Sequence, residues 1–206
     1  MRRFSGVLPH GHGTHAFRHL PAAIRTGVAQ AYEVDGPSME PTVFQGERVV
    51  AVRCAYGLSL PFVTDAVVMW SSPEVGDVVI VESPAADRAD LVKRVVGTAG
   101  DVITIEYGVV MRNGAPFQSA SAGPCDPARE LDPSDECRLT REHDSSHAGS
   151  WLTSRSEPSA RESMAPIEVP PGHVFVMGDH RDRSNDSRSL GPIPVTRVSG
   201  RVLFVE

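Results

Sequence analysis

Three features of the sequence predict an all-β fold. The chain of 206 residues contains 18 Gly and 17 Pro, a frequency typical of many turns and few long helices. Short runs rich in Val and Ile recur along the chain, as expected of β-strands. Gly-Asp pairs at residues 76–77 and 100–101 interrupt these runs, as turns do. With 40% hydrophobic and 22% charged residues, the chain can bury the core of one or two globular domains.

The first 33 residues are expected to form a polar tail followed by a short helix. Residues 1–20 are rich in polar and turn-forming residues. Within residues 21–33, Ile24, Val28 and Tyr32 are four positions apart, which places them on one face of a helix. No run of about 18 apolar residues occurs, so we expect no transmembrane helix in the chain as written.

The β-strand pattern occupies residues 34–114 and 166–206, which we expect to form one β domain. Predicted strands lie at residues 48–53, 77–82, 91–96, 101–106, 109–112, 173–177 and 198–205. Asn113-Gly114 is expected to form a tight turn. Residues 115–165 are dominated by Ser, Ala, Pro and charged residues, which predicts a long, polar and partly disordered insertion.

Composition excludes several function classes. The net charge of -6 argues against a protein that binds nucleic acid through phosphate contacts. Three cysteines are too few for a disulfide-dense scaffold or a four-cysteine zinc site. Cys125 and Cys137 could pair in an oxidising compartment or remain free thiols in a reducing one. The nearby His10, His12 and His15 have no Cys or carboxylate at ligand spacing, so we expect no metal there.

The segment Gly36-Pro37-Ser38-Met39-Glu40-Pro41-Thr42 could present a nucleophile. Pro37 and Pro41 restrict the backbone on both sides of Ser38. Such a rigid loop suits a reactive hydroxyl, because misplacement of a nucleophile is costly. Taken alone, the segment is more typical of a Pro-rich turn with an incidental Ser.

A lysine within a Val-rich strand is the second candidate. Lys93 shares a strand face with Leu91 and Val95, whereas Arg94 competes for the inward face. Burial lowers the pKa of a lysine, and a neutral lysine can act as a general base. Arginine keeps its proton, so only Lys93 could be the base. The alternative is a solvated lysine on an edge strand.

The third candidate is the polar segment 178–188, Gly-Asp-His-Arg-Asp-Arg-Ser-Asn-Asp-Ser-Arg, directly after a predicted strand. Its density of Asp, Arg and Ser is typical of an ion-paired loop that supports a site, or of a solvated turn. It lacks the spacing of a calcium-binding EF-hand loop. His180 also leaves open a Ser/His/Asp triad.

Together these three segments resemble the type I signal peptidases, the bacterial leader peptidase family of membrane-bound Ser/Lys peptidases. The family pattern S-M-x-P-T matches residues 38–42, and K-R-V-x-G-x-x-G-D matches residues 93–101. The pattern G-D-N-R-D-N-S-x-D-S-R matches residues 178–188 with two changes. The three motifs occur in the family's order, and the resemblance covers about residues 30–114 and 172–205.

The resemblance implies a signal-peptidase-like antiparallel β fold and a serine endopeptidase that removes signal peptides from exported preproteins. It assigns Ser38 as the nucleophile and Lys93 as the general base, with no cofactor. Ser184 is expected beside Lys93, and Met39 on an apolar surface near the membrane. The supporting residues implied by the resemblance are Asp179, Asp186 and Arg188.

This chain departs from the family pattern at several positions. Gly36 stands two residues before the nucleophile, where members usually carry Ser or Thr and sometimes Gly, so a side-chain oxyanion donor is missing. His180 and Arg183 replace two Asn residues. Residues 1–33 resemble a remnant or truncated membrane anchor. The family location implied is the outer, periplasmic face of the bacterial cytoplasmic membrane.

Two further interpretations remain open at this point. A catalytically impaired or soluble paralogue would bind peptide termini without cleaving them; intact Ser38 and Lys93 argue against it, and Gly36 argues for it. A repressor-type Ser/Lys autoprotease would need an N-terminal helix-turn-helix, for which residues 1–33 are too short and too rich in Pro and Gly.

Overall fold

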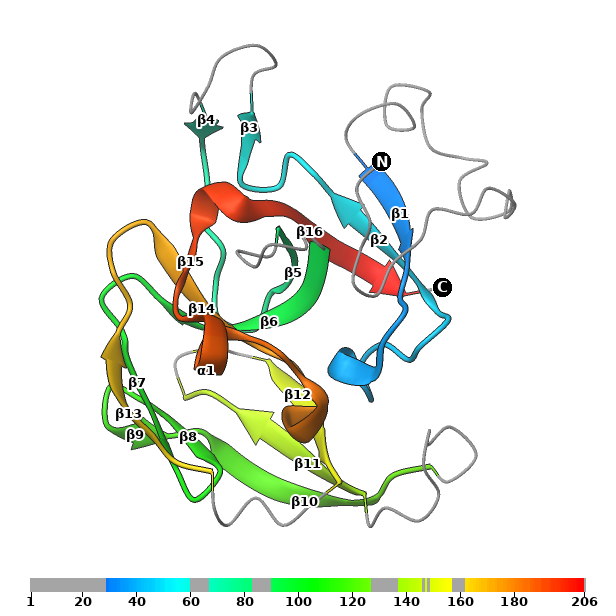
Figure 1. Cartoon of the computed structure of the whole chain (residues 1–206), viewed down its shortest axis with the longest axis vertical. Coiled ribbons are helices and arrows are strands. Elements are labelled where there is room, and N and C mark those ends of the chain that lie inside the picture. The colour runs from blue at the N-terminus through cyan, green and yellow to red at the C-terminus, as the bar shows by residue number, and fades with distance from the viewer. Residues whose placement is uncertain are drawn as a thin grey trace.

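The computed structural model describes residues 29–59, 67–82, 90–126, 137–145, 147, 149–156 and 162–205. These residues form mainly antiparallel β-strands, with one short α-helix, α1 (Ser187–Leu190). The all-β fold predicted from the sequence is therefore confirmed. Figure 1 shows a large sheet on one side of the molecule and smaller sheets, which include β7, β8 and β10–β12, on the other.

The largest sheet has seven strands. Their order is β1 (Ala29–Glu33), β2 (Arg48–Val52), β16 (Val198–Val205), β5 (Val78–Glu82), β6 (Asp90–Thr98), β14 (His173–Met177) and β15 (Ile193–Pro194). Five of the predicted strands are thus neighbours in this sheet. The C-terminal strand β16 inserts between β2 and β5, a long-range pairing that joins the two β stretches of the sequence.

A four-stranded sheet packs on the other side of the core. Its order is β13 (Met164–Glu168), β7 (Val102–Glu106), β8 (Val109–Arg112) and β9 (Ala115–Pro116). Asn113 and Gly114 connect β8 and β9 with φ angles of 54° and 77°, the left-handed conformation that a two-residue hairpin turn requires. A separate hairpin pairs β3 (Gly57–Ser59) with β4 (Val67–Met69).

Where the sequence predicts a partly disordered insertion over residues 115–165, the structure contains an accessory sheet. Its three antiparallel strands are β10 (Gln118–Pro124), β11 (Arg138–His143) and β12 (Ser150–Arg155). All but one of the β10 residues are exposed, so the apolar alternation that identifies a half-buried strand is missing from the sequence. Main-chain pairing and the burial of Phe117 and Trp151 hold this sheet instead.

The predicted helix over residues 21–33 is wrong for the part that the structure describes. Residues 29–33 form strand β1, which pairs along its whole length with β2. Tyr32 is buried there in a cluster with Val49 and Ile80, so tertiary pairing overrides the helical spacing. Residues 21–28 lie outside the described part of the chain.

Strand β6 lies where three apolar clusters meet. Val92 belongs to the first cluster, Val95 to the second and Val96 to the third. Both faces of this strand are consequently covered, unlike the half-exposed strand of a simple sheet. The polar side chains in the middle of β6, Lys93 and Arg94, therefore lie in the protein interior.

Cys125 and Cys137 form a disulfide that joins the end of β10 to the start of β11. The two residues are 12 positions apart, a loop whose closure restricts the unfolded chain. We expect reduction to lower the free energy of unfolding by about 2–3 kcal/mol, measured by denaturant titration with and without a thiol reductant. The Cys125→Ser/Cys137→Ser variant should have the same free energy of unfolding as the reduced protein. The Cys54→Ser variant should still lose stability when a thiol reductant is added. Equal midpoints after verified reduction would contradict the prediction.

Candidate active site

The segment around Ser38 is a tight 3-10 turn, η3 (Pro37–Met39). Pro37 occupies its first position, where a fixed φ favours the turn and a missing N–H costs nothing. The N–H of Glu40 donates to the Pro37 carbonyl at 3.0 Å. Ser38 itself is half-buried, so its hydroxyl is held in place by a turn that is rigid on both sides.

Met39 anchors this turn in the core. It is 0% exposed and packs with Tyr32, Val43 and Val49. The expectation that Met39 belongs to an apolar surface near a membrane is therefore wrong. In a 3-10 turn, consecutive side chains are rotated by about a third of a turn, so Met39 is buried in the core while Ser38 faces Lys93.

Lys93 lies on β6 and points at the nucleophile candidate. Its Nζ donates to Ser38 Oγ at 2.7 Å and to the Val92 carbonyl oxygen at 2.7 Å. The side chain is only 2% exposed. Burial lowers the pKa of the Lys93 ammonium from 10.5 to about 8, although the Asp186 and Asp179 carboxylates favour its charged form. A hydroxyl beside an amine that readily loses its proton is the arrangement of a nucleophile and its base.

Arg94 is also buried. Alternation along a strand predicts that only one of Lys93 and Arg94 points inward, but the structure buries both. Its guanidinium donates to both oxygens of Asp179, from Nε at 2.8 Å and from Nη2 at 2.7 Å. It also lies over the Trp151 ring, 5.3 Å from the centroid. This two-pronged ion pair fixes the segment that follows β14 against β6, next to Lys93.

The polar segment 178–188 is folded and ion-paired. Asp186 accepts a hydrogen bond from the Gly178 N–H at 2.9 Å and pairs with Arg188, whose Nε lies 2.8 Å from Oδ1. Burial disfavours the Asp186 carboxylate, but the hydrogen bonds from Arg188 outweigh it and lower the pKa of Asp186. Asp186 and Arg188, two of the supporting residues that the resemblance implies, thus form an ion pair in a loop beside the Ser38–Lys93 pair.

Gly178 is a site residue that the sequence analysis did not single out. A Cβ atom at this position would lie 2.2 Å from Ser184 Oγ and 2.4 Å from the Ser38 carbonyl oxygen. Only glycine therefore lets the 178–188 segment approach the nucleophile turn. The signal available in the sequence was that Gly178 directly follows the strand at 173–177 and begins the polar segment, where a close approach of the backbone requires glycine.

Ser184 lies on this segment with a buried hydroxyl. The closeness of both Ser184 and Ser38 to Gly178 places the Ser184 side chain near the nucleophile turn. The hydrogen bonds of Lys93 run to Ser38 and Val92. A direct orienting contact from Ser184 to Lys93 stays a prediction.

Comparison with known proteins identifies the family. The model of the family described as signal peptidase, peptidase S26, matches residues 15–205. The chain belongs to this signal peptidase family. It is 26% identical to signal peptidase I of Pseudomonas fluorescens and 28% identical to that of Pseudomonas aeruginosa, over 88% of this chain in both cases. The chain spans 66% of the length of each of these relatives, slightly less than two thirds.

Among solved structures, a crystal structure of signal peptidase I from Enterococcus faecalis is similar, with a TM-score of 0.39 and 21% sequence identity. The match covers 65% of the present chain and 98% of the Enterococcus faecalis chain.

Gly36, where signal peptidases usually carry a hydroxyl residue, precedes η3 in an extended conformation. Its φ of −156° is accessible to any residue. A Cβ atom built there meets nothing within 4 Å. The structure of this signal peptidase family member therefore has room for a side chain at position 36.

The described residues contain no group of three or more His, Cys, Asp or Glu side chains arranged to hold a metal ion. His10, His12 and His15 lie outside them. Of the helices within the described ranges, none is long and apolar enough to cross a membrane.

The Ser/His/Asp alternative finds no matching geometry in the described residues. His180 is buried, but its ring nitrogens face Ser156 and Glu40, whereas the Ser38 hydroxyl contacts Lys93. The described residues thus bring Ser38 next to Lys93 and not to His180, with the Arg94–Asp179 and Asp186–Arg188 ion pairs in the neighbouring segments.

Proposed function

We propose that this protein is a serine endopeptidase that removes N-terminal signal peptides from exported preproteins. The observation that carries the proposal is the 2.7 Å contact between Lys93 Nζ and Ser38 Oγ, made by an amine that is almost completely buried. Family membership and the names of the relatives support the same activity.

In the proposed reaction, neutral Lys93 takes the Ser38 proton while Oγ attacks the carbonyl carbon of the scissile peptide bond. The carbonyl electrons form an oxyanion, which accepts a hydrogen bond from the Ser38 backbone N–H. Lys93 then returns its proton to the leaving nitrogen, and the C–N bond breaks. A water molecule, deprotonated by Lys93, hydrolyses the acyl-Ser38 ester and regenerates both residues.

The substrate class follows from the family resemblance. Preproteins would bind as an extended segment beside a strand, with small residues such as Ala at positions -1 and -3. Cleavage would take place at the outer face of the bacterial cytoplasmic membrane. Trp70, 56% exposed at the end of β4, could supply an apolar contact to the membrane surface.

A peptide that contains Ala-x-Ala before a mature sequence tests the proposal. Wild-type protein should cut after the second Ala, as identified by mass spectrometry of the products, and should not cut the same peptide with Trp at position -1. Ser38→Ala controls for contaminating proteases and should be inactive, whereas Ser150→Ala, at the exposed first position of β12, should be active. Binding of the peptide without cleavage by wild type would favour the impaired paralogue instead.

The pH profile of cleavage should follow the proton of Lys93. Because the base must be neutral, kcat/KM should rise about tenfold per pH unit below the pKa and level off above about pH 8. Initial rates between about pH 6 and 9.5 measure this, with melting temperatures recorded over the same range to exclude unfolding. A flat profile across that range would show that Lys93 is not the titrating base.

A further inference from the structure

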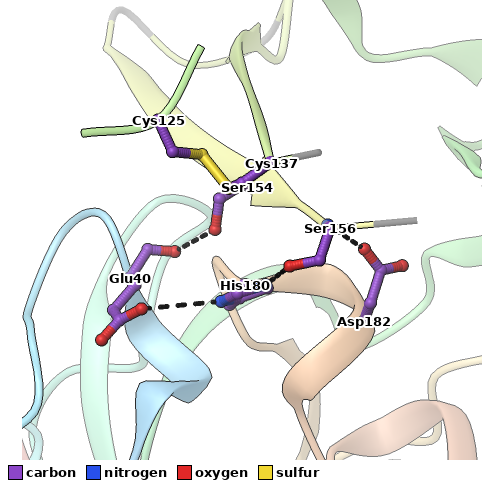
Figure 2. Close-up of a disulfide and its surroundings, with 7 residues drawn as sticks. All are labelled: Glu40, Cys125, Cys137, Ser154, Ser156, His180 and Asp182. Carbon is purple, nitrogen blue, oxygen red and sulfur yellow. Dashed lines mark hydrogen bonds and ion pairs between the residues drawn. A yellow bond between two sulfur atoms is a disulfide. The ribbon is translucent and has the colours of Figure 1, made fainter. Parts of the chain in front are cut away.

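His180 connects the nucleophile turn to the accessory sheet. It is 0% exposed, and its backbone N–H donates to the Ser38 carbonyl oxygen at 3.1 Å. Its ring lies between two side chains: Nε2 is 2.9 Å from Ser156 Oγ, and Nδ1 is 3.8 Å from a Glu40 carboxylate oxygen (Figure 2). One residue thus contacts the nucleophile, the residue two positions after it, and the end of β12.

The accessory sheet holds the same turn at a second point. Ser154 Oγ donates to the backbone carbonyl of Glu40 at 2.8 Å, and the Ser154 N–H donates to the Asp179 carbonyl at 2.9 Å. The Ser156 N–H is bonded in turn to the Asp182 carboxylate at 2.8 Å. Figure 2 shows Glu40 and Ser156 on either side of His180, with Ser154 bonded to Glu40 and Asp182 bonded to Ser156.

The charged groups around the His180 ring show why it suits this place. The Glu40 carboxylate is 5% exposed, and a buried carboxylate is stable only with polar or cationic partners. The Nδ1 atom of His180 faces it at 3.8 Å, while Asp182 is turned to the backbone of Ser156 and Asp179 to Arg94. A side chain that faces Glu40 on one side and bonds Ser156 on the other must carry two polar atoms on opposite edges, as imidazole does.

Resting on the proposed peptidase function, we propose that His180 is a positioning residue for Ser38. Its backbone N–H bonds the Ser38 carbonyl oxygen while its imidazole faces Glu40 and bonds Ser156, next to β12, and so keeps Ser38 Oγ within reach of Lys93. The family pattern has Asn at this position, and an Asn amide ends near the place of Nδ1, too short to contact Ser156. The link to the accessory sheet is therefore a property of this chain's own residues.

The test uses His180→Asn, Ser156→Ala and the double variant in the peptide cleavage assay. His180→Asn keeps a polar group toward Glu40 but loses the bond to Ser156, and Ser156→Ala removes the same bond from the other side. Each should lower kcat about tenfold with KM nearly unchanged, because only the placement of the reacting group is disturbed. The double variant should be no worse than either single variant, since both remove one interaction.

His180→Gln should rescue most of the activity, because its amide reaches the place of Nε2. Ser150→Ala at the start of β12 and His173→Ala at the start of β14 are matched controls, and we expect wild-type kcat from both. Wild-type kcat in His180→Asn and Ser156→Ala would overturn the proposal, as would additive losses or losses that track melting temperature.

If Ser38→Ala cleaves like wild type, the peptidase function itself fails. If Ser38→Ala is inactive while the His180 and Ser156 variants are unimpaired, only the positioning role fails.

Discussion

Replacing Lys93 by Arg is expected to abolish peptide cleavage, with kcat reduced about a thousandfold or more. Arginine is of similar length and can still contact Ser38 Oγ, but its guanidinium does not lose a proton in a protein. The wild-type amine lies 2.7 Å from Ser38 Oγ and has a pKa lowered by burial to about 8, so about a tenth of it is neutral at pH 7. The measurement is single-turnover cleavage of the Ala-x-Ala peptide.

Lys93→Met separates this catalytic loss from a loss of folding. The folded-state pKa of Lys93 lies below its unfolded value, so the unfolded chain binds more protons between about pH 8 and 10.5, and stability rises with pH there. Below that window, burial of the charged amine costs about 3 kcal/mol. Methionine removes this cost, so the variant should be inactive yet melt no lower than wild type at pH 7. Residual cleavage by Lys93→Arg near the wild-type rate would rule out Lys93 as the base.

Replacing Gly36 by Ser is expected to raise kcat about tenfold or more, because it adds an oxyanion donor that the chain lacks. The substitution is sterically allowed: Gly36 has an extended backbone, and its Cβ would meet nothing within 4 Å. A hydroxyl there would lie two residues before the nucleophile, where related enzymes usually carry Ser or Thr. KM should change little, since the new bond forms mainly with the oxyanion.

Gly36→Ala is the matched control for that gain. It restricts the backbone as Ser does but offers no hydrogen bond, so its kcat should stay at the wild-type level. A rise shared by both variants would indicate backbone stiffening. Equal kcat for Ser and Ala at position 36 would show that the hydroxyl does not reach the oxyanion.

The strands at 48–53, 77–82 and 173–177 could be predicted because each is a short run of Val and Ile bounded by turn residues. The three polar motifs, in their order, were enough to nominate Ser38, Lys93 and the Asp186–Arg188 pair. By contrast, the accessory sheet could not be predicted, because β10 is almost entirely exposed and main-chain pairing leaves no apolar pattern in its sequence.

Met39 shows a different limit of the sequence. The family resemblance implied a surface role for this residue, yet the turn buries it completely. The contacts around His180 could not be predicted from the sequence either, since Glu40, Ser156 and His180 are far apart along the chain. Contacts of this kind depend on how the sheets pack against each other.

The sequence by itself determined the strand-rich fold class, because strand and turn residues follow a local pattern, and its resemblance to a family nominated Ser38 and Lys93 as nucleophile and base. Only the tertiary structure decided that Lys93 and Arg94 are both buried. Alternation along a strand distinguishes two faces, but it cannot reveal that apolar clusters cover both of them. That double coverage strips water from the amine of Lys93 and places it against Ser38.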